Sequence, residues 1–368
     1  MLGGNRVCLY HDGDQCLPAM LAAIEEAREE ILLEMYWFDS DATGRRFAEA
    51  LCEKARQGVR VCVTYDAVGS FEADRDQFER MCAAGCQVFE YRPVHFWRPR
   101  FRLAGLNRRN HRKMLVVDGR LGMTGGVNLG DAWAPFSEGG GGFRDDMIAI
   151  EGPAVADMRE IFFTAFRAPG WQQAQAAAVA APASAGGCKV RVVANHRLRD
   201  RRAIERAYLR RIHAAQHSIL ITNSYFIPGR EVRLGLARAV ERGVRVQVLL
   251  PVDSDVFAVR FATHRLYGWM LRRGIELYEW GQSILHSKTA VIDGRWCTVG
   301  THNLDYRSWA FNLEINVTVE DAQVAAELQA RMQRDMDESV PVQAGQWRFR
   351  PLGDRLLELL FYRFRRLL

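Results

Sequence analysis

Residues 111–128 have the sequence HRKMLVVDGRLGMTGGVN, and residues 286–303 have the sequence HSKTAVIDGRWCTVGTHN. Both stretches follow the pattern His-x-Lys-x4-Asp, and after six further residues both continue with Gly-(Gly/Thr)-x-Asn. A pattern of this length that occurs twice in a chain of 368 residues indicates an internal duplication, which has to be recognised before a fold is assigned.

The duplication extends upstream of these motifs. EEILLEMYWF at 29–38 matches HSILITNSYFI at 217–227, and GVRVCVTYDAVGS at 58–70 matches GVRVQVLLPVDSD at 243–255. The separation between the copies falls from 188 residues in the first of these segments to 175 residues at the motifs. The loops have therefore shortened while the order of the elements has been kept.

The local sequence is of the α/β type. Amphipathic spacing predicts helices at 19–28, 45–56, 202–215 and 231–242. Apolar, β-branched runs predict strands at 31–36, 59–65, 114–118, 219–222, 244–250 and 289–293. Such strands between helices indicate a largely buried sheet that helices cover on both faces. We expect two homologous α-β-α sandwich halves related by a pseudo-twofold axis, with one active site at their interface.

Four segments are expected along the chain. The first half spans 1–171, and an Ala-, Pro- and Gly-rich linker follows at 172–187. The second half spans 188–346, and a basic amphipathic helix occupies 347–368.

The paired motif predicts phosphoryl-transfer chemistry. A His and a Lys two residues apart on a strand point to the same face, and Gly tolerates a positive φ and a close backbone approach that lets Asn join them. Two lysines and two amides would bind a phosphodiester and its transition state, while two imidazoles with pKa values near ~6.5 would act as nucleophile and general acid/base. We expect a phosphohistidine intermediate. A single His-x-Lys is usually a surface pair, but the duplication argues against that alternative. The candidates are His111, Lys113, Asn128, His286, Lys288 and Asn303.

Acidic residues complete the candidate site. Asp145 and Glu314 follow the motifs at equivalent places and are expected to orient the imidazoles, with ordinary strand-edge acids as the alternative. Asp118 and Asp293 belong to the catalytic motif, although both precede Gly, and a structural or site-organising role in Asp-Gly turns is favoured over proton transfer. His302 is a further residue that could reach the site.

Cofactors and metals are not expected. The sequence has no HExxH motif and no zinc-type Cys/His spacing, and two lysines would repel a divalent cation. The eight cysteines lie mostly in apolar stretches, so we expect free thiols. Trp37, Phe38, Tyr225 and Phe226 stand at equivalent strand ends and are expected to pack in the core, with lining of a substrate groove as the alternative.

The charge pattern suits an anionic partner. The formal charge is +6, and only four of the 50 basic residues are lysines, of which two belong to the motifs. No acidic residue occurs between Glu90 and Asp118. The basic-aromatic segments 96–102 and 348–368 favour an anionic membrane surface over nucleic acid. No apolar run is long enough to span a bilayer, and no secretory signal is evident, so we expect a peripheral protein at the cytoplasmic face of the cell membrane.

The doubled motif resembles that of the phospholipase D superfamily, also called the HKD family. FRDDMIAIEGPAV at 143–155, DYRSWAFNLEINV at 305–317 and the Arg/Leu-rich tail are similar to the bacterial cardiolipin synthases that lack N-terminal transmembrane helices. The resemblance implies transfer of a phosphatidyl group to phosphatidylglycerol, giving cardiolipin and glycerol without a cofactor. It also implies His111 as nucleophile and His286 as acid/base. A phospholipid hydrolase, a metal-independent nuclease and a catalytically inactive scaffold are the alternatives.

Overall fold

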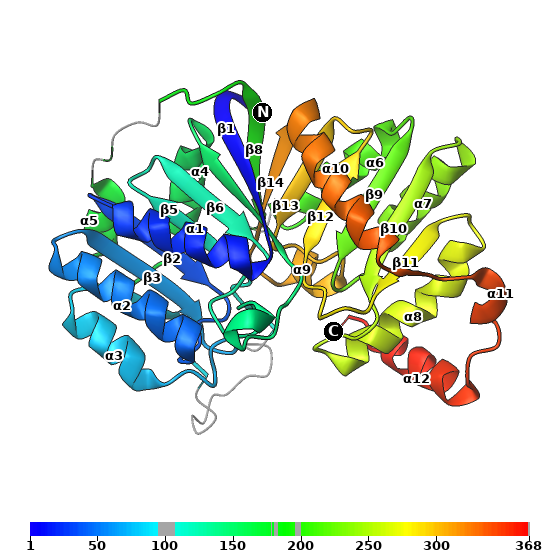
Figure 1. Cartoon of the computed structure of the whole chain (residues 1–368), viewed down its shortest axis with the longest axis horizontal. Coiled ribbons are helices and arrows are strands. Elements are labelled where there is room, and N and C mark those ends of the chain that lie inside the picture. The colour runs from blue at the N-terminus through cyan, green and yellow to red at the C-terminus, as the bar shows by residue number, and fades with distance from the viewer. Residues whose placement is uncertain (95–106, 178, 180–182, 196–199, 367–368) are drawn as a thin grey trace.

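A computed structural model describes residues 1–94, 107–177, 179, 183–195 and 200–366 (Figure 1). The first half contains β1 (Leu2–His11), α1 (Asp12–Glu26), β2 (Glu30–Met35), α2 (Ala42–Arg56), β3 (Arg60–Asp66), α3 (Arg75–Ala83), β4 (Gln87–Tyr91), β5 (Met114–Val117), β6 (Leu121–Gly125), η2 (Phe136–Glu138), β7 (Asp146–Glu151), α4 (Ala154–Phe162) and α5 (Trp171–Ala176).

The second half repeats this arrangement. Its elements are β8 (Cys188–Asn195), α6 (Ala203–Ala214), β9 (Ser218–Asn223), α7 (Arg230–Glu241), β10 (Arg245–Pro251), α8 (Phe257–Leu271), β11 (Glu276–Trp280), β12 (Lys288–Ile292), β13 (Trp296–Gly300), α9 (Tyr306–Ala310), β14 (Glu314–Glu320) and α10 (Ala322–Asp337). The short strand β15 (Val340–Pro341) and the helices α11 (Ala344–Trp347) and α12 (Leu352–Arg363) follow.

The order of the strands demonstrates the duplication. The first half has the order β1-β7-β6-β5-β2-β3-β4, and the second has β8-β14-β13-β12-β9-β10-β11, with β15 added at its edge. In both halves the last three strands are parallel and the others pair antiparallel. Strands β1 and β8 pair antiparallel in the middle and join the halves into one sheet. The predicted pair of α-β-α halves is confirmed.

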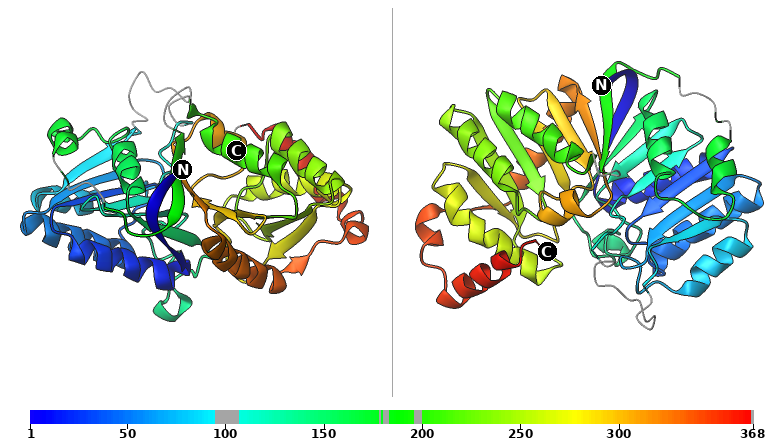
Figure 2. Two further views of the ribbon diagram at one scale, coloured as in Figure 1. Left: turned by 90° about the horizontal axis from the view of Figure 1, so that it is seen from above. Right: turned by 180° about the vertical axis from the view of Figure 1, so that it is seen from behind.

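Helices cover both faces of the sheet, as the two views of Figure 2 show. The helices α1, α2 and α3 pack on one face of the first half, and α6, α7 and α8 pack on one face of the second. The third apolar cluster extends from α4 to α10 through strands of both halves. This shared core holds the two halves in a fixed relative position. Side chains from both halves can therefore form one site at their junction.

The ends of the motif strands have the turns that the sequence predicts. Asp118 and Asp293 have φ angles of 51° and 54°, and Gly119 and Gly294 both have φ angles of 59°. Successive positive φ angles are what a tight Asp-Gly hairpin turn needs. All eight cysteines are free thiols. None of the helices in the described ranges has the length and apolar character that a membrane crossing requires.

Candidate active site

The motif segments of the two halves interlock through their backbones. The N–H of His111 donates to the carbonyl of Leu313 over 3.0 Å, and the N–H of His286 donates to the carbonyl of Arg144 over 2.8 Å. The residues that follow these acceptors are Glu314 and Asp145. The backbone N–H of each motif histidine therefore bonds to the residue that directly precedes the acid of the opposite half.

The side chains form the same crossed pairs. Nδ1 of His111 lies 3.1 Å from Oε2 of Glu314, and Nδ1 of His286 lies 2.8 Å from Oδ2 of Asp145. A carboxylate that accepts the Nδ1 hydrogen fixes the ring and leaves the lone pair of a neutral imidazole on Nε2. The alignment of the two repeats shows that Asp145 and Glu314 are equivalent positions. The structure adds that each of these acids contacts the histidine of the opposite half.

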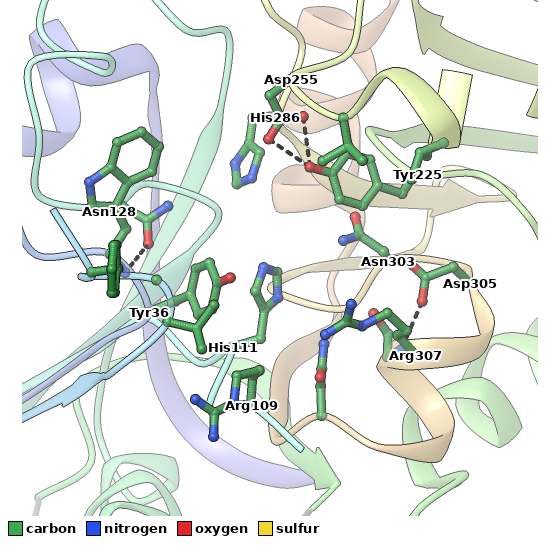
Figure 3. Close-up of a pocket in the computed structure, with 18 of the residues that line it drawn as sticks. Tyr36, Arg109, His111, Asn128, Tyr225, Asp255, His286, Asn303, Asp305 and Arg307 are labelled. Atoms are coloured by element: carbon green, nitrogen blue, oxygen red, sulfur yellow. Dashed lines mark hydrogen bonds between the residues drawn. The ribbon is translucent and has the colours of Figure 1, made fainter. Parts of the chain in front are cut away.

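Both histidines line one pocket of about 550 Å³ between the halves (Figure 3). Asn128 and Asn303 line it as well. Oδ1 of Asn128 accepts from the backbone N–H of Trp37 over 3.1 Å, and Oδ1 of Asn303 accepts from Oγ of Ser224 over 2.9 Å. With both oxygens engaged, the NH₂ groups point toward the pocket, where they can donate to an anion (Figure 3).

The two lysines are buried behind the pocket wall. Nζ of Lys113 donates to the carbonyl of His111 over 3.0 Å and lies 5.0 Å from the ring centre of Tyr36. Nζ of Lys288 donates to Oγ of Ser224 over 2.9 Å and to the carbonyl of His286. Burial, followed by the charge of Lys288, lowers the pKa of Lys113 to about 7, and burial lowers the pKa of Lys288 to about 8.

Burial and the lysine charges also act on the imidazoles. Burial, followed by the charge of Lys113, lowers the pKa of His111 to about 4. Burial, followed by the charge of Lys288, lowers the pKa of His286. The sequence led us to expect unperturbed imidazoles, one neutral and one protonated near neutrality, whereas burial and the lysine charges lower the pKa values of both. A bound phosphodiester brings the negative charge that would raise both pKa values again.

The two copies differ in how the acid is held. In the second copy, Oγ1 of Thr301 donates to Oε2 of Glu314 over 2.5 Å. In the first copy the equivalent residue is Gly126, where a Cβ atom would lie 2.0 Å from Oδ1 of Asp145. The shorter Asp carboxylate thus occupies the space that the Thr side chain fills in the other copy. The two differences between the copies, Gly126 in place of Thr301 and Asp145 in place of Glu314, therefore compensate for one another.

The first motif glycine is required by space and not by its backbone conformation. A Cβ atom at Gly125 would lie 2.2 Å from the carbonyl oxygen of Asp146, and one at Gly300 would lie 2.4 Å from that of Ile315. Neither glycine has a positive φ angle. The sequence suggested two reasons for glycine at this position. The structure confirms the close backbone approach, but the φ angle is not positive.

Asp118 and Asp293 are not brought to the pocket. The carboxylate of Asp118 accepts from the backbone N–H groups of residues 28, 29 and 30 at distances from 2.7 to 3.2 Å. Asp293 accepts equivalently from the N–H groups of residues 216, 217 and 218. These groups begin β2 and β9, so the motif aspartates tie neighbouring strands together. Their place in the catalytic motif is corrected to a structural role.

Other sequence candidates are divided between pocket and core. Trp37 and Tyr225 line the pocket, whereas Phe38 and Phe226 are buried in the core. His302 is buried and does not line the pocket. Several lining residues were not predicted from the sequence, because they lie outside the two His-x-Lys motif stretches 111–128 and 286–303. These are Tyr36, Arg109, Trp133, Asp255, Asp305 and Arg307.

In the part of the chain that the structure describes, no three His, Cys, Asp or Glu side chains are grouped so that they could hold a metal ion.

Comparison with known proteins identifies the family of the chain. A family model described as "Cardiolipin synthase, PLD-like domain" matches residues 20–135 and 208–336. The chain is 32% identical to the probable cardiolipin synthase YwiE of Bacillus subtilis, over 96% of this chain and 70% of that protein. It is 34% identical to cardiolipin synthase B of Escherichia coli K12, over 86% of this chain and 77% of that protein.

A solved structure shares the whole fold. The crystal structure of a phosphatidylserine synthase from Haemophilus influenzae Rd KW20 superposes with a TM-score of 0.73 at 14% identity, over 98% of this chain and 95% of that one. The fold and the crossed site thus define a two-repeat protein of the phospholipase D-like class. Within that class, the chain belongs to the family of cardiolipin synthases with phospholipase D-like domains.

Proposed function

We propose that this protein is a cardiolipin synthase-like phosphatidyltransferase that moves a phosphatidyl group to phosphatidylglycerol and releases an alcohol such as glycerol. The observation that carries the proposal is the single pocket in which both imidazoles are oriented by carboxylates of the opposite half. A nucleophile and an acid/base that share one pocket suit a double displacement at one phosphorus. The names of the curated relatives agree with this chemistry.

The reaction uses a neutral Nε2 on His111 and a protonated Nε2 on His286, whose pKa the bound phosphodiester raises. Nε2 of His111, the nucleophile that the family resemblance implies, attacks phosphorus and forms a P–N bond while the P–O bond to the departing alcohol breaks. His286 gives its proton to that oxygen. An incoming phosphatidylglycerol hydroxyl then loses its proton to His286, a P–O bond to its oxygen forms, and the P–N bond breaks. Lys113 and Lys288, together with the amides of Asn128 and Asn303, would stabilise the additional negative charge.

The C-terminal helix supports binding to a membrane surface. On its inner side, Glu358 is buried and pairs with Arg350, and Phe361 packs against Phe257 and Phe261 of α8. Its leucines point outward, and Leu352 and Leu356 are 73% and 69% exposed. An apolar face turned to solvent, on a helix whose last turn carries Arg363 and is followed by Arg365 and Arg366, suits the headgroup region of an anionic bilayer.

We therefore infer a peripheral protein at the cytoplasmic face of the cell membrane, with phosphatidylglycerol and cardiolipin as its lipid partners. Of the two membrane segments predicted from the sequence, 96–102 lies outside the described residues. The segment 348–368 is described up to residue 366 as a turn followed by α12, and it does not form one continuous helix.

The test is an assay of the purified protein on phosphatidylglycerol vesicles in EDTA, with products resolved by mass spectrometry. We expect cardiolipin and glycerol in equal amounts. Phosphatidic acid as the only lipid product would instead identify a hydrolase, and plasmid cleavage without lipid turnover would identify a nuclease.

A further inference from the structure

The two halves line the shared pocket with different kinds of side chain. The wall that the first half contributes is mainly aromatic and apolar, with Tyr36, Trp37, Val68, Phe71 and Trp133, although Glu72 and Arg109 also line the pocket from this half. The second half contributes a group with hydroxyl, carboxylate and amide oxygens, which we call the polar wall: Tyr225, Asp255, Asp305, Ser308 and Asn312. A pocket that bound only a phosphate group would not need two walls of different chemical character.

One part of the polar wall is a hydroxyl-carboxylate pair. The phenol of Tyr225 donates to the carboxylate of Asp255 over 2.6 Å (Figure 3). Tyr225 is equivalent in the repeat to Trp37, which presents an indole instead of a hydroxyl. The second half therefore has a phenol in place of the Trp37 indole and a carboxylate in place of the Ser70 hydroxyl.

The other part surrounds the short helix α9. Asp305 caps it by accepting from the N–H of Ser308 over 2.7 Å, and its equivalent in the first copy is Gly130. Oγ of Ser308 and Oδ1 of Asn312 have no hydrogen-bond partner among the described residues. Ser308 is 1% exposed yet lines the pocket. A buried hydroxyl without a protein partner is unfavourable unless a ligand or water completes its hydrogen bonds.

Carboxylates in a pocket for a phosphodiester also require an explanation. Asp255 and Asp305 would repel the phosphate itself, but they are strong acceptors for the O–H groups of an alcohol. Arg307 and Arg109 line the same pocket, and Arg109 is also paired with Asp66, so the pocket contains positive as well as negative groups. Burial raises the pKa of Asp305 to about 7, so this group can also donate a hydrogen bond when protonated.

We propose that the polar wall is the binding site for the hydroxyl groups of the neutral polyol joined to phosphorus, the glycerol headgroup of the donor lipid. The proposal rests on the proposed function. In this arrangement the glycerol headgroup lies against α9 and Asp255, while the diacylglycerol side of the phosphodiester faces the aromatic wall. The polar wall thus selects the lipid by its headgroup hydroxyls, and the histidines act on the phosphorus between the two walls.

The experiment compares phosphatidylglycerol with phosphatidylmethanol, which has the same phosphodiester and no headgroup hydroxyl. Both are presented in detergent micelles, and kcat/KM is taken from total phosphatidyl release, whether the acceptor is an alcohol or water. We expect the native protein to prefer phosphatidylglycerol at least about tenfold. Ser308→Ala should reduce this preference about threefold and Asp255→Asn about tenfold. Ser308→Ala removes an oxygen that has no partner in the described protein, so its fold should be unaffected.

Ser137→Ala, at an exposed position of η2 outside the pocket, is the matched control and should keep the native preference. An unchanged preference in both polar-wall variants, or no preference in the native protein, would overturn the proposal. A native preference for phosphatidylethanolamine over phosphatidylglycerol would do so as well. If phosphatidylglycerol is only hydrolysed but the preference still falls in the variants, the transferase proposal fails and the headgroup site stands.

Discussion

The first half, from β1 to α5, and the second half, from β8 to α10, have seven strands each in the same order, yet they contribute different surfaces to the pocket. The groups that would act on phosphorus are duplicated with little change: one His, one Lys and one Asn from each half. The groups that would contact the rest of the substrate have diverged into an aromatic and a polar wall. Both steps of a double displacement take place at the same phosphorus atom, whereas the groups attached to that atom differ. The residues that would act on phosphorus are alike in the two halves, and the residues that would contact the attached groups are not.

The largest expected effect separates the roles of the two histidines. His111→Asn and His286→Asn should each reduce kcat by roughly 10³-fold or more, because each removes one reacting group. With a phosphatidyl ester of p-nitrophenol, whose leaving group needs no protonation, His286→Asn should accumulate phosphohistidine because no base activates the acceptor. His111→Asn should accumulate none. Phosphoenzyme in His111→Asn alone, measured by intact-protein mass spectrometry, would reverse the two roles.

Exchanging the buried lysines should have the next largest effect. Lys113→Arg and Lys288→Arg are expected to lower kcat/KM about 100-fold each, because a forked guanidinium does not fit a buried site shaped for an ammonium. Lys189→Arg, at an exposed position of β8, is the matched control and should keep native activity. Near-native rates in both motif variants would show that any positive charge suffices.

The two ways of holding the acid can be exchanged. Glu314→Asp should lower kcat about tenfold, since the shortened carboxylate loses its contact with His111. Adding Thr301→Gly should restore part of this loss, because it recreates the Asp-Gly combination of the first copy. If the double variant is no more active than the single one, the two motif differences do not compensate in the way that the structure indicates.

The pH dependence of kcat/KM tests the coupling between Lys113 and His111. With the pKa of His111 at about 4, the nucleophile is neutral at physiological pH, so activity should persist down to about pH 5. Above pH 7–8 the lysines lose their protons, and binding of the phosphate should weaken as pH rises. The charge of Lys113 lowers the pKa of His111, so Lys113→Gln should move the acid limb to higher pH. An acid limb that stays in place would contradict this coupling.

The smallest effect on chemistry is expected at the C-terminal helix. Leu356→Ser together with Leu359→Ser removes part of the exposed apolar face of α12, and each lost apolar contact should cost on the order of 1 kcal/mol of bilayer binding. Vesicle co-sedimentation should fall several-fold, while turnover of a short-chain soluble lipid is kept. Equal losses in both assays would indicate that the helix supports folding and not membrane binding.

Much of this architecture could be predicted from the sequence because the duplication is periodic and apolar. Strands such as β2 and β10 are mainly apolar, and the two copies of the motif have to meet in space if they form one site. The pairing of β1 with β8 was not predicted, since it depends on how two sheet edges meet. Nor was the crossing of Glu314 to His111, because the partner lies 203 residues away and is fixed only by tertiary packing.

The residues of the pocket walls were the hardest to find. Asp255 lies in a loop and Ser308 lies in the five-residue helix α9, which is too short for a periodic signal, and only the folded chain brings them next to the motif. The lowered pKa values of the imidazoles could not be predicted either, because they result from burial beside two ammonium groups. The Asp-Gly turns, in contrast, follow from the sequence because their conformation is local.

The central claim is that both imidazoles act on one phosphorus atom. A crystal structure of the protein soaked with vanadate tests it most directly, since vanadate adopts the five-coordinate geometry of phosphorus in transfer. The account predicts one vanadium centre bonded to Nε2 of His111, with Nε2 of His286 within hydrogen-bond distance of its opposite oxygen. Two separate vanadate ions, one at each histidine with no shared centre, would contradict it.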